Sequence, residues 1–244
     1  YKKAADKDDL DSIIKYSKML YEGDGVPVNK KEASVYYKKA ADKGDLDSII
    51  KYGKMMHDGD GVLIDKKEAS KYLKKAADGG DMDSIIMYGK MKLNGDGVPV
   101  DKKEASKYIK KAADNGDANS ISLYKELIFS GELVDKKESI DYIKRLADSG
   151  DGESIFEYAK MLENGNGVSV NKQEALEYYR ISASKGKVES FYRCAKILDS
   201  FNDLEAIDFY KRAAYFYHHT ESMYEYALIL KNGKGVGVDK NKAC

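Results

Sequence analysis

Acidic side chains that recur at one position of a repeated phrase are the first residues here that could do chemistry. One glutamate stands in each copy of the phrase, at Glu32, Glu68, Glu104, Glu138, Glu174 and Glu205. Two carboxylates can act as general acid and general base when the fold holds them side by side. Each copy supplies only one, however, and an Asp or Asn stands three residues before every glutamate, as in a helix capping box. The column therefore predicts helix starts and no catalytic pair.

The glycine-rich turns are a second place where a ligand could bind. The phrase DGDG at 58–61, with Asp65 after it, has part of the pattern of a calcium loop. An EF-hand loop needs oxygen ligands at several fixed positions and a bidentate Glu at the twelfth, and other copies carry Asn166 or Lys234 in place of the second Asp. The Gly-x-Gly pairs lack the Lys-Ser/Thr of a phosphate loop and follow no predicted strand. We predict turns here, with no metal and no cofactor.

Nucleophiles and metal ligands are scarce. The chain has three histidines and two cysteines. Cys194 falls on the apolar face of a predicted helix, so we expect it to be buried, and no base is placed to activate it. His218 and His219 are adjacent, but no further metal ligands accompany them. The sequence predicts no catalytic residue.

These residues belong to a repeat of about 36 residues, which positions them all. Serines mark its register, at Ser12, Ser48, Ser84, Ser120, Ser154, Ser190 and Ser222. Each unit contains two helical patterns, for example at 44–56 and 65–78, and apolar residues recur on one face of each. On these two helices they are Ile49, Tyr52, Met55 and Met56, then Ala69, Tyr72, Ala76 and Ala77. A fixed period of this length predicts an all-α fold, an α/α superhelical solenoid of helix-turn-helix repeats.

The phrase itself points to a family. Its pattern is Glu-Ala-x-x-Tyr-x-x-Ala-Ala-x-x-Gly, then a helix, then Gly-x-Gly-Val-x-x-Asp. This pattern resembles the SEL-1-like repeat, a relative of the tetratricopeptide repeat, over essentially the whole chain. The resemblance implies a solenoid that acts as a non-catalytic scaffold or adaptor for protein–protein interaction. Ser48 and its equivalents depart from the family, which usually has Ala there, although a small residue of either kind is compatible with packing.

Two alternatives stay open at this stage. Members of this family often stand beside signalling enzymes, so the chain could be the regulatory or substrate-docking arm of a larger enzyme such as a protein kinase. The pentatricopeptide class, which binds nucleic acid, has a similar period. The 42 basic and 42 acidic residues balance, which disfavours nucleic acid because released counterions supply most of that affinity.

Composition also bears on the compartment and on the extent of the protein. No stretch reaches the roughly 18 apolar residues of a membrane span. Two cysteines cannot build a disulfide framework, which indicates an intracellular, cytoplasmic protein. We expect residues 1–244 to form a single solenoid of six to seven units. Tyr1 aligns with Leu73 and Ala243 with Ala69, both inside second helices, so we expect flanking domains of a longer chain.

Departures from the repeat are where partner specificity could lie. In the first helices, the second and third residues after the serine could face a concave groove that takes a partner helix or extended peptide. The apolar members predicted to line it are Met87, Leu123, Phe156, Tyr192 and Tyr224. The alternative is that contact between neighbouring helices absorbs the second of these positions.

A second departure is the segment YFYHH at 215–219, which replaces the polar turn found at 41–45. Tyr215, Phe216 and Tyr217 could bind a partner or a C-terminal segment, or they could reflect local repacking. A basic column also recurs, at Lys2, Lys38, Lys74, Lys110, Lys144, Arg180 and Lys211. We interpret it as a solvated face, with docking to an acidic partner as the alternative.

Overall fold

The computed structural model describes residues 1–131, 135–201 and 203–233, and within them every regular element is a helix. The predicted all-α helix-turn-helix architecture is confirmed. The chain forms two compact units, Tyr1–Val134 and Asp135–Cys244, which are described separately below. The single solenoid over 1–244 stays a prediction. Asn202, Lys234 and Ala243 lie outside the described residues.

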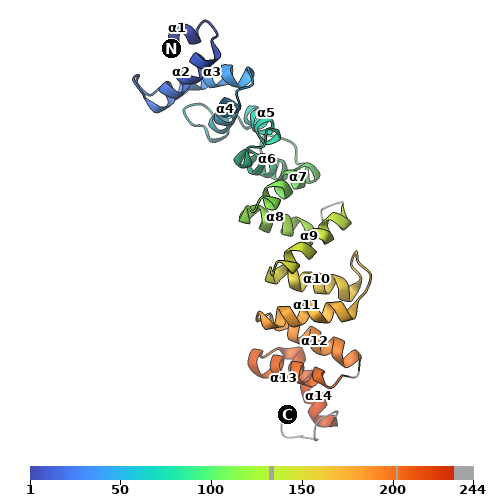
Figure 1. Ribbon diagram of the computed structural model, residues 1–244. Helices are drawn as coiled ribbons and strands as arrows, with labels where there is room; N and C mark the ends of the chain where they lie inside the picture. The colour runs from blue at the N-terminus through green and yellow to red at the C-terminus, as the bar shows by residue number, and fades with distance from the viewer. Residues whose placement is uncertain (132–134, 202, 234–244) are drawn as a thin grey trace. The chain divides into compact units, whose positions relative to one another are not determined.

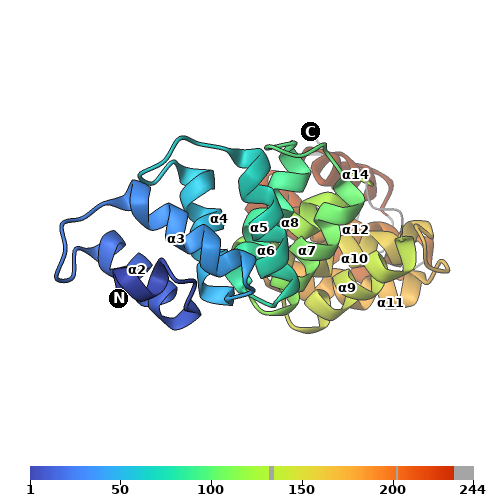
Figure 2. The same ribbon diagram turned by 90° about the horizontal axis from the view of Figure 1, so that it is seen from above.

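The first unit contains eight described helices. They are α1 (Lys2–Ala5), α2 (Leu10–Glu22), α3 (Lys30–Asp42), α4 (Leu46–Asp58), α5 (Lys66–Asp78), α6 (Met82–Asn94), α7 (Lys102–Asp114) and α8 (Ala118–Phe129). Each even-numbered helix is the first helix of a repeat: α2, α4 and α6 pack against the helices before and after them, and α8 packs against α7. Figure 1 shows this succession, and Figure 2 shows α2 to α5 from above.

The second unit repeats the arrangement. Its described helices are α9 (Lys136–Asp148), α10 (Gly152–Asn164), α11 (Lys172–Ser184), α12 (Val188–Ser200), α13 (Glu205–Tyr217) and α14 (Thr220–Asn232). Consecutive helices pack against each other along this series (Figure 1).

The first N–H groups of a helix have no acceptor within the helix, and at most helix starts here a side chain accepts one of them. The predicted Asn/Asp–Glu pairs are confirmed at second helices: Asn29, Asp65, Asp101, Asp135 and Asn171 each accept the N–H of the glutamate three residues later. The predicted Asn202–Glu205 pair includes a residue outside the described part, and Asp203 accepts the N–H of Glu205. An unpredicted second series caps the first helices. In it Asp9, Asp45, Asp81, Asp117 and Asp151 accept the N–H of the repeat serines.

Glycines set the turns, as the sequence predicts. Gly44 follows α3 with φ +94°, a left-handed conformation that a side chain strains. At Gly61 there is no room for a side chain, since a Cβ there would lie 2.2 Å from the Cβ of Lys30. The repeat therefore keeps glycine for two different reasons.

Alanine and tyrosine build the core between repeats. Ala40, Ala76 and Ala112 are fully buried, and such small residues let neighbouring helices approach closely. Tyrosine rings fill the remaining space in edge-to-face pairs, for example Tyr52 with Tyr72 at 4.7 Å between ring centroids. This geometry suits the charge distribution of aromatic rings. The predicted apolar stripes are confirmed.

Candidate functional site

Several of the recurrent glutamates pair with recurrent basic residues of the neighbouring repeat. Lys38 on α3 contacts Glu68 at the start of α5 at 2.9 Å, and Arg180 on α11 contacts Glu205 on α13 through two bonds of 2.8 and 2.5 Å. Lys71 and then Lys38 donate hydrogen bonds that hold the pKa of Glu68 below its usual range. These glutamates are therefore charged partners in contacts between repeats and are poor candidates for proton transfer.

Tyrosine hydroxyls form a second contact between repeats. The tyrosine of one second helix donates to the aspartate that ends the second helix before it, at 2.6–2.7 Å in four places: Tyr36–Asp6, Tyr72–Asp42, Tyr108–Asp78 and Tyr178–Asp148. The bond to Asp6, followed by burial, raises the pKa of Tyr36 to about 12. Such a hydroxyl stays protonated at neutral pH. The tyrosine hydroxyls and aspartates that recur in this chain thus join neighbouring repeats.

The remaining reactive groups are also accounted for. Cys194 is fully buried, as expected, and burial raises the pKa of its thiol to about 12, so it is a poor nucleophile near neutral pH. In the part of the chain that the structure describes, no group of three or more His, Cys, Asp or Glu side chains could hold a metal ion. Among the same residues, no helix has the length and apolar character needed to cross a membrane.

The predicted groove residues have different environments. Met87 and Leu123, in the first unit, are half-buried, and Met87 packs against the cluster of Leu73 and Met91. Phe156, in the second unit, is only 7% exposed and meets Tyr179 edge-to-face at 5.7 Å. Contact between helices therefore absorbs Phe156, the alternative that the sequence left open.

The other two residues of that prediction lie near the end of the second unit. Tyr192 is half-buried, with its ring centroid 5.0 Å from that of His219. Tyr224, the fifth residue of α14, is 65% exposed. Tyr224 is thus available to a partner, whereas Tyr192 is used partly in packing.

The last turn of α13 places three aromatic side chains at the surface. Tyr215, Phe216 and Tyr217 are 52%, 75% and 41% exposed. We call these three residues and Tyr224, the exposed aromatic side chains of α13 and α14, the aromatic patch. Tyr217 also contacts Phe191 at 5.2 Å between centroids, so part of the patch is anchored while Phe216 faces solvent.

Histidines replace the usual turn residues beside this patch. His218 adopts the left-handed conformation with φ +51°, which glycine adopts in other repeats. His219 caps α14 by accepting the N–H of Ser222 through Nδ1 at 3.3 Å, the role that aspartate has elsewhere. The sequence contained this signal, since two histidines stand where Gly-Asp is usual. The predicted change of the turn is confirmed, and the structure adds how the turn is rebuilt.

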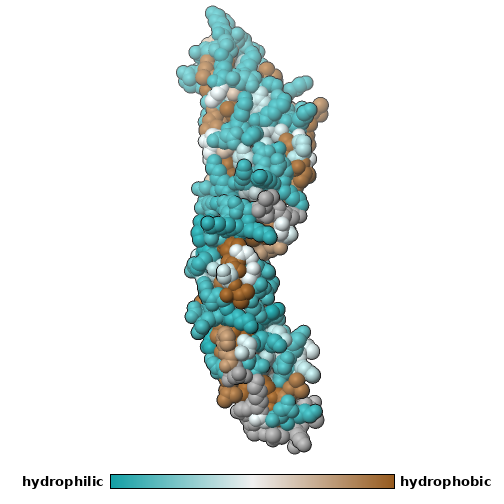
Figure 3. Space-filling model, turned by 90° about the vertical axis from the view of Figure 1, so that its right-hand side faces the viewer, coloured by the Kyte–Doolittle hydropathy of each residue, from teal (hydrophilic) through white to brown (hydrophobic). Residues whose placement is uncertain are grey.

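Apolar surface elsewhere is modest and has a structural role. A residue that precedes the cap of each second helix is 57–60% exposed in four repeats: Val28, Ile64, Val100 and Val170. Each lies over the glycine that ends the helix before it, as Val28 does over Gly23. The face shown in Figure 3 is accordingly hydrophilic over most of its area, with separate hydrophobic patches.

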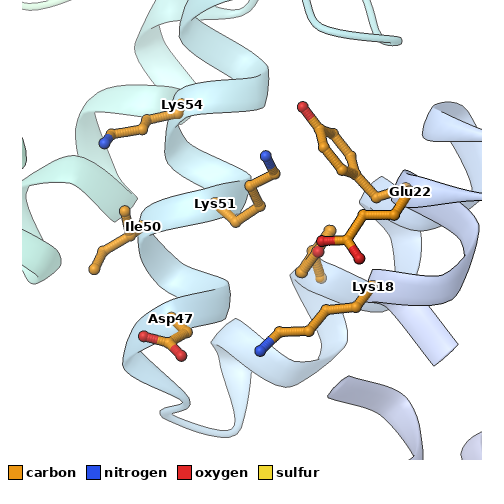
Figure 4. Close-up of a pocket in the computed structure, with 8 residues that line it drawn as sticks. Lys18, Glu22, Asp47, Ile50, Lys51 and Lys54 are labelled. Atoms are coloured by element: carbon orange, nitrogen blue, oxygen red, sulfur yellow. The ribbon is translucent and has the colours of Figure 1, made fainter. Parts of the chain in front are cut away.

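A pocket of about 350 Å³ in the first unit was not predicted. It is lined by residues of α2 and α4 and by Tyr37 of α3, and Figure 4 shows its side chains. Its lining residues are Lys18, Tyr21, Glu22, Tyr37, Asp47, Ile50, Lys51 and Lys54. In the next copy His57, Leu73 and Met87 stand in place of Tyr21, Tyr37 and Lys51, so the sequence held a signal for the pocket that the repeat pattern did not bring out.

Comparison with known families assigns the fold. The family model for the Sel1 repeat matches residues 10–45, 46–81, 83–117, 152–187, 200–215 and 220–244. The chain belongs to the Sel1 repeat family. The matched Sel1 segments leave out residues 118–151, which hold α8, α9 and the end of the first unit.

Solved Sel1 structures agree with this assignment. A crystal structure of c5321, a protective antigen of uropathogenic Escherichia coli with an SLR fold, is 22% identical with a TM-score of 0.51. The match covers 98% of this chain and 53% of that protein, so the chain spans about half the length of that relative. A Sel1 repeat protein from Oxalobacter formigenes is 24% identical with a TM-score of 0.50, over 79% of this chain and 80% of that one. No curated protein matches the sequence.

Proposed function

We propose that the chain is a non-catalytic scaffold or adaptor that binds a protein partner through the aromatic patch of its second unit. The observation that supports this most directly is the exposure of Phe216 and Tyr224, 75% and 65%, in repeats whose usual polar turn has been replaced. Sel1 repeat proteins generally act as scaffolds for protein interaction, which agrees with this assignment.

The exposed aromatic residues are not needed to form the turn. The left-handed residue His218 and the cap His219 restore the backbone geometry without help from Phe216. Aromatic residues are enriched at the centres of protein interfaces, because they bury a large apolar area with few rotatable bonds. An exposed cluster of them on an otherwise polar surface is typical of a binding site.

A non-catalytic role is supported by what the recurrent polar groups do. The glutamates, the tyrosines and the basic residues join neighbouring repeats, as with Lys38–Glu68 and Tyr72–Asp42. A carboxylate whose pKa is lowered by such a contact, as that of Glu68 is, is a weaker proton acceptor.

The test is a pull-down from cell extract, quantified by mass spectrometry, with two double variants of the full chain. Phe216→Ser with Tyr224→Ser removes the two most exposed members of the aromatic patch. Val28→Ser with Ile64→Ser is the matched control, because these side chains are 58% and 60% exposed and lie in the first unit.

We expect a specific partner to be recovered with the native chain and the control variant, and to be lost at least tenfold with the patch variant. Circular dichroism at 222 nm should show equal helicity for all three proteins. Recovery of the same partners by all three, or equal loss in both variants, would contradict the assignment to the aromatic patch.

A further inference from the structure

The pocket between α2 and α4 combines cations with apolar surface. Lys18 projects from α2 and Lys51 from α4 into the space between the two helices, as Figure 4 shows. Tyr37 of α3 is 4% exposed and Ile50 of α4 is half-buried, and both belong to the lining. A ligand here meets both positive charge and apolar surface.

One wall of the pocket is held in place before any ligand arrives. The Tyr21 hydroxyl donates a hydrogen bond to Asp60, which also accepts one from Lys30 at 2.6 Å. The ammonium of Lys51 lies 3.5 Å from the centre of the Tyr21 ring, a cation–π contact. Because the ring is fixed from its far end, Lys51 has a defined position, and ordering it costs little on binding.

The two lysines of this pocket differ from the lysines of the second helices. Lys30, Lys38 and Lys66 each contact a carboxylate of the next repeat within 3 Å. Within the described part of the chain, Lys18 and Lys51 make no ion pair at 4 Å or less and donate no hydrogen bond to a carboxylate, although Lys51 lies close enough to Asp60 to help lower the pKa of that carboxyl. Their capacity for a charge-assisted hydrogen bond to a carboxylate is thus unused.

The next repeat shows why this is a local site. There Lys54, the equivalent of Lys18, is paired with Asp83 at 2.7 Å. Met87 stands in place of Lys51 and packs against the cluster that contains Leu73. The two positions that carry unpaired lysines between α2 and α4 therefore hold an ion-paired lysine and an apolar side chain in the next repeat.

The acidic residues of the rim limit the class of ligand. Glu22 and Asp47 are both exposed and belong to the lining, beside three lysines. A continuous polyanion such as a nucleic acid would meet these carboxylates as well as the lysines, and like charges brought together oppose binding. A peptide can instead place single carboxylates on Lys18 and Lys51 and an aliphatic side chain between them.

We infer that this pocket binds an acidic linear segment of a protein partner that carries leucine or a similar aliphatic residue between its carboxylates. The carboxylates pair with Lys18 and Lys51, and the aliphatic side chain contacts Ile50 and Tyr37. The inference rests on the proposed scaffold function but uses the first unit, whereas the proposed function was assigned to the aromatic patch of the second.

The experiment measures fluorescence anisotropy of a fluorescein-labelled peptide, Ser-Gly-Glu-Leu-Glu-Gly-Ser, titrated with the full 244-residue chain. Two double variants carry the same change of charge: Lys18→Glu with Lys51→Glu in the pocket, and Lys31→Glu with Lys67→Glu on exposed sites of the second helices. Two further peptides replace Glu by Gln or Leu by Ala, and a single-stranded oligothymidine serves as the nucleic-acid probe. A Lys18→Gln, Lys51→Gln variant replaces the charge reversal if the latter does not fold.

We expect saturable binding that the pocket variant weakens about tenfold or more, since two exposed ion pairs become repulsions, and that the control variant changes less than twofold. Both altered peptides should bind more weakly than the parent. Absence of saturable binding, equal effects of the two variants, indifference to Leu→Ala, or oligothymidine binding with the same lysine dependence would each overturn the inference. Retained partner capture through the aromatic patch would then show that the proposed function survives without it.

Discussion

The turn after α3 and the turn after α13 perform the same task with different residues. In the first unit, Gly44 is left-handed and Asp45 caps α4, with its N–H donated to the carbonyl of Ala40 at 3.1 Å. In the second unit, His218 is left-handed and His219 caps α14, with its N–H donated to Ala213 at the same distance. The backbone therefore sets what the turn requires, and more than one pair of side chains can meet it.

The difference between the two turns lies in what surrounds them. The first is polar, and its Lys43 makes an exposed ion pair with Asp8 at 2.5 Å. The second carries the aromatic patch. Replacement of Gly by His at a left-handed position costs stability, so the second turn is the less favourable solution for folding. A surface retained in spite of that cost is the better candidate for binding.

Exchanging the left-handed residues should have the largest effect on stability. Gly44→Ala should lower the free energy of unfolding by about 1–2 kcal/mol, because an L residue is strained at φ +94°. His218→Gly should raise it by up to about 1 kcal/mol, because the same strain is relieved. Urea denaturation followed at 222 nm measures both.

Gly152→Ala is the control for this exchange. Gly152 begins α10 without a positive φ, and a Cβ there would lie 4.0 Å from its nearest neighbour, on Lys185. Alanine should stabilise this position by about 0.5–1 kcal/mol. Equal signs for Gly44→Ala and Gly152→Ala would show that left-handed geometry is not what selects glycine after α3.

Removal of either cap should have the next largest effect. Asp45→Ala and His219→Ala should each cost about 1 kcal/mol, because each leaves a helix N–H without its acceptor. Thermal unfolding compares them. His219→Asn, which keeps an acceptor and places no carboxylate beside Glu189 and Glu221, should be more stable than His219→Ala. An unchanged stability of His219→Ala would show that the two turns are not equivalent.

The repeat serines should respond in opposite directions in the two turns. The Ser48 hydroxyl is buried and has no hydrogen-bond partner among the described residues, whereas the Ser222 hydroxyl lies 3.0 Å from Nδ1 of His219. Ser48→Ala should therefore stabilise by up to about 1 kcal/mol, and Ser222→Ala should destabilise by about 0.5–1 kcal/mol. Denaturation midpoints of both variants, and of Ser84→Ala as a second orphan hydroxyl, test this contrast.

Lowering the pH should change the stability least, and only through the helices that an aspartate caps. Hydrogen bonds from the hydroxyl and then the N–H of Ser12 lower the pKa of Asp9, and those from Ser120 lower the pKa of Asp117. A lowered pKa in the folded state means that the stabilisation is present above 3.8, the ordinary value, and is lost as the pH falls through the folded pKa. Melting temperatures between pH 6 and pH 2 should fall less for Asp9→Asn with Asp117→Asn than for the native chain.

The fold was largely predictable because local signals and the repeat agree. The stripe of Ile49, Tyr52 and Met55, the cap at Asp65 and the left-handed Gly44 each specify an element without reference to the rest of the chain. A period of 36 residues then repeats the same local decision. Assignment to the Sel1 family follows from this agreement.

The candidate sites were only partly predictable. The aromatic patch could be predicted because it interrupts the pattern at 215–219, whereas the pocket between α2 and α4 depends on side chains from three helices, whose meeting the repeat pattern does not show. Phe156 was predicted at a surface, although it packs against Tyr179 of the next helix. Sequence spacing places a residue on a helix face but does not say which neighbouring side chain covers that face.

The sequence by itself determined that this protein is a stack of helix pairs with capped starts and glycine turns, because those features depend on residues within one repeat. Only the tertiary structure decided how the copies use their charges. Lys38 finds Glu68 thirty residues away, Lys54 finds Asp83, and Lys18 finds no carboxylate within the described residues. Lysines at equivalent positions therefore differ in whether they form an ion pair, because such a pair forms only when two side chains from separate helices come within a few ångströms of each other.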